Sequence, residues 1–410
     1  SFLKTKRKYQ LFFTLCLMIL TSICELFSLA SLIPFISVLI NPEQVLDIKI
    51  INYIFDLFGL LDPKEIIVFC TLIFICVALL SSIVRILSLW CNTRVVALVG
   101  NDLSCLAYKK TLHQKYLTHI CRNSSEVVGT LVTEINDLVL ALNYVLIVLA
   151  NLFISISIVF TLFIISWKIA ILSLGSFSFT YYLISKITQE KIQQKGFQIS
   201  SSAKEQLKSM QESFGGIREL ILDNNYSYYE KKYFTKDYIK RIKFADINFL
   251  GFFPRFLMEG FSLAAFALIG VLLLNNSENP EQILPILGAT ALGIQKLLPS
   301  MQQIYSGLSA LRGYRKVIIN VIGYLNQKSY NISSYKRYKP LPFKNKIQIK
   351  DISFEYEGSN DKLIKNINLE IKKGEFIGII GKTGCGKSTL LDLIMGLINP
   401  SEGSIKIDNI

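Results

Sequence analysis

Long apolar runs alternate along the chain with segments rich in charged residues. An α-helix needs roughly 20 residues to cross a hydrocarbon layer about 30 Å thick, so runs of this length predict membrane-spanning helices. Six such runs lie at about residues 11–40, 66–99, 138–165, 169–187, 248–274 and 283–311. The pattern therefore predicts an all-α membrane domain of six helices over residues 1–325.

Positive charge follows the polar segments and sets the expected topology. Lys and Arg are frequent before the first run and in the two long polar segments, 100–137 and 188–246, but sparse in the short turns between other runs. Such charge favours the cytoplasmic side. We therefore expect a multi-pass protein of a bacterial-type inner (plasma) membrane, with the N-terminus and the C-terminal region in the cytoplasm. Cytoplasmic loops then explain the net charge of +14 without a nucleic-acid partner.

Residues 45–61 place Asp47, Asn52 and Asp56 as a narrow polar stripe among apolar positions, which is typical of an amphipathic helix. Two interpretations stay open: a helix on the membrane surface, or a loop helix packed on the protein.

The 8 cysteines show no zinc or disulfide spacing, so we interpret them as free thiols. The chain begins at Ser1 with no cleavable signal peptide, and we expect it to be a fragment.

After a linker at about 326–346, the pattern changes to that of a soluble α/β domain over 347–410. Residues 347–356 and 369–371 read as strands. A short apolar run at 376–380 then precedes a glycine-rich loop, and 390–397 reads as a helix. The loop residues are Gly381, Lys382, Thr383, Gly384, Cys385, Gly386, Lys387, Ser388 and Thr389.

This order of strand, glycine loop and helix predicts a phosphate-binding loop. Its backbone N–H groups and the helix N-terminus would face the phosphates of a nucleoside triphosphate. Lys387 would reach the β- and γ-phosphates, and the Ser388 hydroxyl would hold Mg²⁺. The alternative is a glycine-rich turn beside a chance lysine, which the surrounding pattern makes the weaker interpretation.

Six spans followed by this loop resemble a half-transporter of the ABC exporters, in the type IV fold. Residues 354–356, 367–375 and 400–408 are similar to the segments that flank the phosphate loop in that family, and 212–220 resembles the approach to its second coupling helix. The resemblance implies that Tyr356 stacks on adenine. It also implies coupling helices near 119–127 and 225–232, which would transmit ATP-driven closure to the membrane helices.

The resemblance further implies ATP hydrolysis by a dimer, with a homodimer expected. The family's Walker B, signature and switch-histidine motifs are absent from these 410 residues, so the nucleotide-binding domain is expected to be truncated and the catalytic residues stay unknown. The fragment alone is expected to be inactive.

Charged residues inside the predicted spans point to the substrate. Arg85, Arg255 and Lys296 lie in spans two, five and six, and Glu259 lies one helical turn from Arg255. Charges at such depth usually face a partner or a wet cavity, and a cationic cavity suits a phosphate or pyrophosphate. The alternative is that these side chains snorkel to the interface.

With the amphipathic helix, these cations resemble the bacterial lipid-linked oligosaccharide flippases of N-glycosylation. That resemblance implies a polyprenyl-diphosphate-linked glycan, or a similar anionic glycolipid, as the substrate. Two alternatives stay open: an exporter of lipid A, a drug or a peptide, and a nucleotide-gated channel or regulatory membrane protein.

Overall fold

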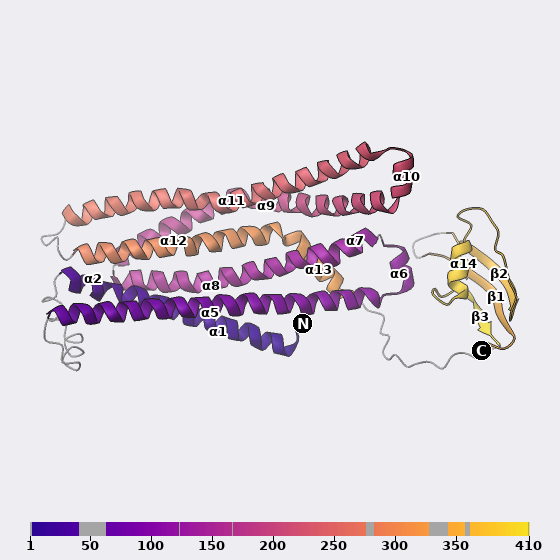
Figure 1. Ribbon diagram of the computed structural model, residues 1–410, viewed down its shortest axis with the longest axis horizontal. Coiled ribbons are helices and arrows are strands. Elements are labelled where there is room, and N and C mark those ends of the chain that lie inside the picture. Colours follow the sequence, from indigo (N-terminus) through magenta and orange to yellow (C-terminus); the bar gives the residue numbers. More distant parts are fainter. Residues whose placement is uncertain are drawn as a thin grey trace. The chain divides into compact units, whose positions relative to one another are not determined.

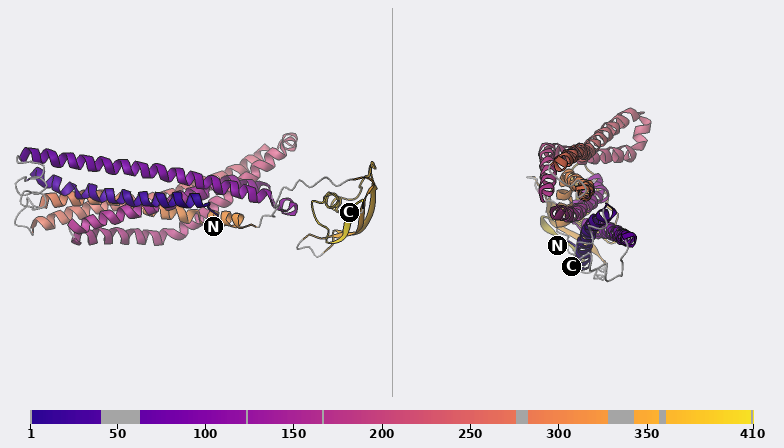
Figure 2. Two further views of the ribbon diagram at one scale, coloured as in Figure 1. Left: turned by 90° about the horizontal axis from the view of Figure 1, so that it is seen from below. Right: turned by 90° about the vertical axis from the view of Figure 1, so that its left-hand side faces the viewer.

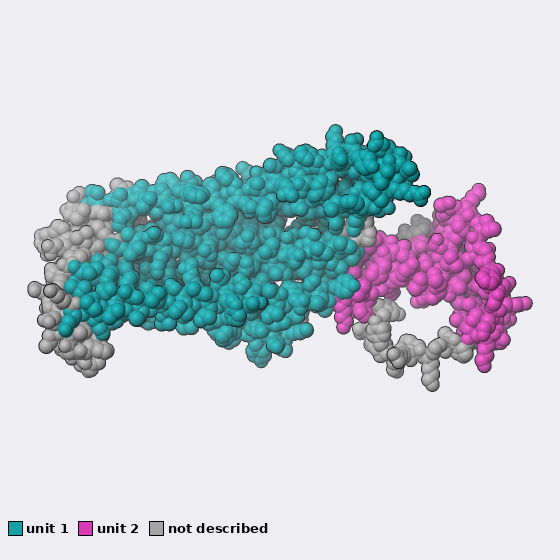
Figure 3. Space-filling view, viewed as in Figure 1, with its two compact units in different colours: residues 1–108, 125–326 teal, residues 109–124, 327–410 magenta. Residues whose placement is uncertain are grey.

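A computed structural model describes residues 2–40, 63–122, 124–165, 167–275, 283–327, 343–356, 361–408 and 410. The chain divides into two compact units. Unit 1 comprises residues 1–108 and 125–326, and unit 2 comprises residues 109–124 and 327–410 (Figure 3). The predicted amphipathic helix at 45–61 lies outside the described residues, as do most of the 275–278 turn and of the linker.

Unit 1 is built from long helices that run side by side (Figures 1 and 2). The long helices are α1 (Thr5–Ala30), α5 (Pro63–Leu112), α8 (Ile135–Ile165), α9 (Trp167–Gly215), α11 (Tyr226–Asn275) and α12 (Ile283–Gly313). The shorter elements are α2 (Leu32–Ile40), α7 (Ser124–Gly129), the π-helical turn η1 (Thr130–Glu134), α10 (Ile217–Leu222) and α13 (Arg315–Asn326).

The long helices extend beyond the predicted apolar runs. α5, α9 and α11 extend into the polar segments, because Lys, Glu and Gln are good helix formers. Three described helices are long and apolar enough to cross a membrane: Thr5–Leu39, Glu65–Leu112 and Val127–Ile164. They make the protein a multi-pass membrane protein. The predicted spans within α9, α11 and α12 stay predictions.

The core of unit 1 lies where α8, α9, α11 and α12 meet. Ile158, Leu162, Met258 and Leu297 are almost fully buried there. By contrast, α5 exposes many large apolar side chains, such as Leu79 and Ile86. Exposed apolar faces of this size suit a hydrocarbon environment rather than water.

Two helices of unit 1 come unusually close at a glycine. A Cβ added to Gly196 of α9 would lie 2.2 Å from the carbonyl oxygen of Gly313, the last residue of α12. Only a residue without a side chain permits this approach. The contact fixes how tightly α9 packs against α12.

Unit 2 contains a three-stranded antiparallel sheet of order β2-β1-β3, formed by β1 (Lys346–Phe354), β2 (Ile364–Lys372) and β3 (Glu402–Ile407). Helix α14 (Lys387–Ile394) packs on it through Leu390 and Leu393. The mostly helical membrane domain followed by the start of an α/β domain confirms the predicted fold class.

One predicted strand of unit 2 is wrong. Residues 376–380 are extended but form no strand, and Phe376 and Ile380 are fully exposed, at 101% and 98%. A strand exists only by pairing, and the three described strands pair with one another instead. The helix prediction at 390–397 is also shifted, because α14 begins at Lys387, directly after the glycine loop.

The short helices differ slightly from the predicted coupling segments. The short helix α6 covers Tyr116–Ile120, a few residues before the centre of the predicted 119–127 segment. The second short helix is α10, whereas 225–232 lies mostly in the first turns of α11. The correction has a local cause: Gly215 and Gly216 end α9, so the short helix follows them at once, and Asn224 with φ 50° ends it.

Candidate functional site: phosphate loop and intramembrane charge cluster

The phosphate loop has the backbone that its glycines predict. Gly384 and Gly386 adopt φ of 85° and 94°, a left-handed conformation that side chains rarely take. Gly386 is the N-cap of α14 and accepts a hydrogen bond from Leu390 N–H at 2.8 Å. The helix therefore starts abruptly, with the N–H groups of its first turn left for a ligand.

Lys387 folds back over this loop. Its Nζ donates to the carbonyl oxygens of Gly381 and Lys382 at 2.7 and 2.8 Å. These oxygens hold the ammonium above the concave side of the loop, where it can exchange them for phosphate oxygens. An ammonium on a flexible stem suits that exchange.

Tyr356 lies beside the first turn of α14. Its hydroxyl is 3.1 Å from Thr389 Oγ1, and its ring meets Phe354 edge to face with centroids 5.0 Å apart. The ring is only partly buried. An aromatic face is thus fixed next to the loop and left open on one side, as base stacking requires.

The loop residues therefore fit a nucleoside triphosphate with Mg²⁺. Gly381 to Thr389 would cradle the phosphates through backbone N–H groups, Lys387 would neutralise them, and the exposed Ser388 hydroxyl would contact the metal. A Cβ on Gly381 would meet Cys385 Sγ at 2.8 Å, so the loop is already closely packed there.

Helix α6 lies against the same unit. Leu117 packs on the apolar cluster that contains Ile352 and Leu393, and Tyr116 Oη lies 3.5 Å from Asp392 Oδ1 in α14. The short helix α6 therefore contacts the helix that begins at the phosphate loop. This is the contact that a coupling segment needs.

A charge cluster inside unit 1 surrounds Glu25. This carboxylate of α1 is 7% exposed; its Oε1 lies 3.0 Å from Lys296 Nζ of α12, and its Oε2 accepts from Ser81 Oγ of α5 at 2.8 Å. Arg85, one turn after Ser81, acts electrostatically on the same carboxylate. The structure thus pairs Lys296 directly with Glu25, whereas Arg85 contributes only a weaker, longer-range charge.

Arg85 also lines a polar cavity of about 210 Å³. Four helices form its walls: α1, α5, α8 and α12. The lining residues are Met18, Thr21, Arg85, Ser88, Leu89, Asn92, Ile147, Ala150, Asn151, Ile154 and Gln303.

The amides of this cavity are only partly satisfied. Asn151 Nδ2 donates to Gln303 Oε1 at 2.8 Å, but Asn92, 5% exposed, has no hydrogen-bond partner for its Oδ1 among the described residues. A buried polar atom without a partner is costly and marks a place for water or a ligand. A cavity of this size holds several waters or one phosphate-sized group.

Arg255 of α11 lies elsewhere. Its charge acts on Tyr181 of α9, whose hydroxyl donates to Gln302 Oε1 at 3.1 Å. Arg255 and Glu259, both described and both exposed, form no ion pair, although they lie one helical turn apart.

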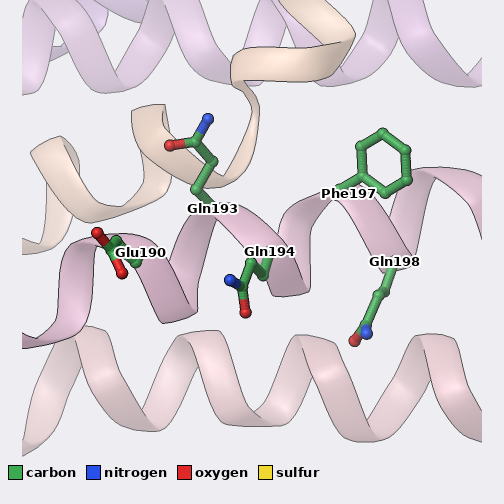
Figure 4. A pocket seen from close by; sticks show the side chains of 5 residues that line it. All are labelled: Glu190, Gln193, Gln194, Phe197 and Gln198. Atoms are coloured by element: carbon green, nitrogen blue, oxygen red, sulfur yellow. The ribbon is translucent and has the colours of Figure 1, made fainter.

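A larger hollow of about 510 Å³ lies beside α9 (Figure 4). Its described lining residues are Glu190, Gln193, Gln194, Phe197 and Gln198, and the ammonium of Lys316 lies 3.3 Å from the centroid of the Phe197 ring. The Glu190 carboxylate distinguishes this hollow from the cavity that Arg85 lines.

Comparison with known families decides the class of the protein. Residues 11–293 match the ABC transporter transmembrane region, and residues 364–410 match the ABC transporter family. The chain belongs to the ABC transporters. The first match covers more than half of the sequence and runs from within α1 into the beginning of α12, while the second covers β2, the phosphate loop, α14 and β3.

The fold of this ABC transporter chain is similar to a solved structure of a bacterial Atm1-family ABC exporter with ATP bound. The TM-score is 0.69 over 98% of this chain and 68% of that chain, with 13% sequence identity. At this identity the likeness shows the fold alone. It agrees with the type IV exporter architecture.

Curated relatives match the nucleotide-binding part of the ABC transporter chain. The energy-coupling factor transporter ATP-binding protein EcfA1 of Fusobacterium nucleatum is 56% identical over 61 residues, 15% of this chain and 22% of that protein. The ergothioneine transport ATP-binding protein EgtV of Helicobacter pylori is 49% identical over 63 residues, 15% and 29% of the two chains. The chain spans less than a third of the length of each of these two relatives.

The sequence alone did not reveal the partners of Glu25 or the amides of the cavity. One signal was present: Ser81, Arg85, Ser88 and Asn92 follow at spacings of four, three and four, which place them on one face of a helix. A polar stripe within an apolar run predicts a side that faces protein or a cavity rather than lipid. The partners from α1, α8 and α12 carry no such signal.

Proposed function

We propose that this protein is an ATP-driven transporter that flips a polyprenyl-diphosphate-linked oligosaccharide, or a similar anionic glycolipid, across the inner membrane. The observation that carries the proposal is the charge cluster with its polar cavity. Arg85 lines a cavity with partly unsatisfied amides, and Lys296 forms an ion pair with Glu25 in the same helix bundle.

The cavity indicates which part of such a lipid it would take. At about 210 Å³ it is too small for an oligosaccharide but large enough for one phosphate-sized group. A guanidinium binds phosphate oxygens in a bidentate manner, and amide N–H groups add further donors. We therefore assign the anionic headgroup to Arg85 and Lys296, with Arg255 as a third cation outside this cavity. The glycan and the lipid tail also lie outside the cavity.

ATP binding at Gly381 to Thr389 would supply the energy. Lys387, Ser388 and Tyr356 would hold the triphosphate, the Mg²⁺ and the adenine. In the proposal two copies of the protein act together, and movement of the nucleotide-binding parts reaches the membrane helices through α6 and α10.

The test uses the full-length protein reconstituted in liposomes. ATP hydrolysis is measured while a polyprenyl-diphosphate glycolipid is added, for the wild type and for Arg85→Ala, Arg255→Ala and Lys296→Ala. The proposal expects stimulation of the wild type and weaker stimulation of each variant. Arg94→Ala is the matched control, because Arg94 also lies in α5 but contacts the Trp90 ring at 5.9 Å rather than the cluster.

If uncharged drugs stimulate ATP hydrolysis and the glycolipid does not, the protein is still an ABC transporter, but the proposal of an anionic substrate is wrong. Unchanged stimulation of all three variants would remove the cavity assignment. Continuous ion current without stoichiometric ATP use would contradict a pump altogether.

A further inference from the structure

The carboxylate of Glu25 contacts Lys296, the same cation that the anionic headgroup of the proposed substrate would contact. Glu25 is 7% exposed and reaches α12 through Lys296 and α5 through Ser81. Removing a carboxylate from water costs several kcal/mol unless partners compensate it. The partner that compensates it here is the cation that the proposed function assigns to the ligand.

The geometry leaves Lys296 able to change partners. Its side chain is 38% exposed, whereas that of Glu25 is 9% exposed, so the lysine is the more accessible partner of the pair. Lysine is a compact charge on a flexible stem, with three donors that can be redirected. Ser81 would continue to satisfy one carboxylate oxygen after Lys296 had turned away.

We propose that Glu25 is an internal counter-ion that competes with the anionic headgroup for Lys296 and thereby sets the affinity and charge selectivity of the site. The inference rests on the proposed function. In the absence of ligand, Glu25 holds Lys296. A diphosphate, with more than one negative charge, displaces the carboxylate, whereas an uncharged amphiphile gains nothing by doing so.

Removing the charge of Glu25 should therefore strengthen anion binding. Glu25→Gln keeps the size of the side chain and a hydrogen bond to Ser81, but it frees Lys296. The dissociation constant for a diphosphate should fall about tenfold, the scale of one hydrogen bond to a charged group. A purely structural ion pair would give the opposite result, because its loss would loosen the bundle and weaken binding.

The experiment uses the full-length protein in lipid nanodiscs, with farnesyl diphosphate as the probe and farnesol as its uncharged counterpart. Dissociation constants are measured for the wild type, Glu25→Gln, the double variant Glu25→Gln/Lys296→Gln and the matched control Glu259→Gln, whose carboxylate is exposed and unpaired. Thermal melting of each variant checks the fold. The double variant removes both charges, so it reports on the site even if the single variant unfolds.

The expected result is tighter farnesyl diphosphate binding by Glu25→Gln, loss of the diphosphate preference in the double variant, and no change for Glu259→Gln or for farnesol. If the wild type prefers the diphosphate but neither Glu25 variant alters that preference, the inference that Glu25 is a counter-ion is overturned, and the proposed function stands. If neither the wild type nor Glu25→Gln distinguishes diphosphate from alcohol, both are overturned.

Discussion

Lys296 Nζ of α12 lies 3.0 Å from Glu25 Oε1 of α1, and this ion pair joins the beginning of the membrane unit to its last long helix. Neither helix could reveal the pair from its own sequence. The ion pair accounts for both charges, because either charge alone among apolar helices would raise the free energy of the folded protein.

Lys296→Ala should destabilise the protein because it leaves Glu25 buried without its cation. Breaking a fully buried pair costs roughly 3–5 kcal/mol, and the partial exposure of Lys296 reduces this to on the order of 1–3 kcal/mol. Thermal unfolding in detergent measures the effect. Adding Glu25→Gln should restore most of the lost stability, and a double variant no more stable than Lys296→Ala would contradict the pairing.

Lys387→Ala should abolish ATP binding while leaving the sheet of unit 2 intact. The Lys387 ammonium contacts loop carbonyls and no strand residue, so its loss removes charge from the loop and little else. Binding of a fluorescent ATP analogue to the full-length protein measures the effect. Lys365→Ala, an exposed lysine of β2, is the control and should bind as the wild type does.

Gly196→Ala should push α9 away from α12. The added Cβ would lie 2.2 Å from the Gly313 carbonyl oxygen, and overpacking of this kind costs typically about 1–3 kcal/mol. Gly175→Ala, also in α9, is the matched control because nothing lies within 4 Å of its Cβ position. The melting temperature should fall for Gly196→Ala only. Equal melting temperatures for the two variants would show that α9 and α12 do not approach so closely.

The loop that enters β1 should open at acid pH. Asp408 accepts backbone N–H groups of Lys344, Asn345 and Lys346, the last two at 2.8 Å, and these bonds hold its pKa below the ordinary aspartate value. A lowered pKa in the folded state means that the stabilisation is complete above the ordinary aspartate pKa of about 3.9. It is lost as the pH falls through the lowered value.

Hydrogen exchange of the amides of residues 344–346 measures this effect. Their protection in the wild type, relative to Asp408→Asn at the same pH, should be largest near neutral pH and should vanish in strong acid. A difference that is independent of pH would show that the charge of Asp408 contributes nothing.

Much of the fold followed from the sequence. Apolar run length predicted the long helices of unit 1, because a helix must satisfy its own backbone within a membrane whatever its neighbours are. The phosphate loop was equally predictable, since Gly384 and Gly386 occupy left-handed positions that glycine favours and the motif is contiguous. These features depend on local chemistry.

The tertiary structure alone decided what the charges inside the membrane meet and which apolar segments pair. Glu25 finds Lys296 and Ser81 on two other helices, while Arg255 does not pair with Glu259 one turn away. The apolar run at 376–380 forms no strand, although its composition favours one. Partners distant in sequence set the free energy of a buried charge or of an unpaired strand, and residue spacing along one element does not contain that information.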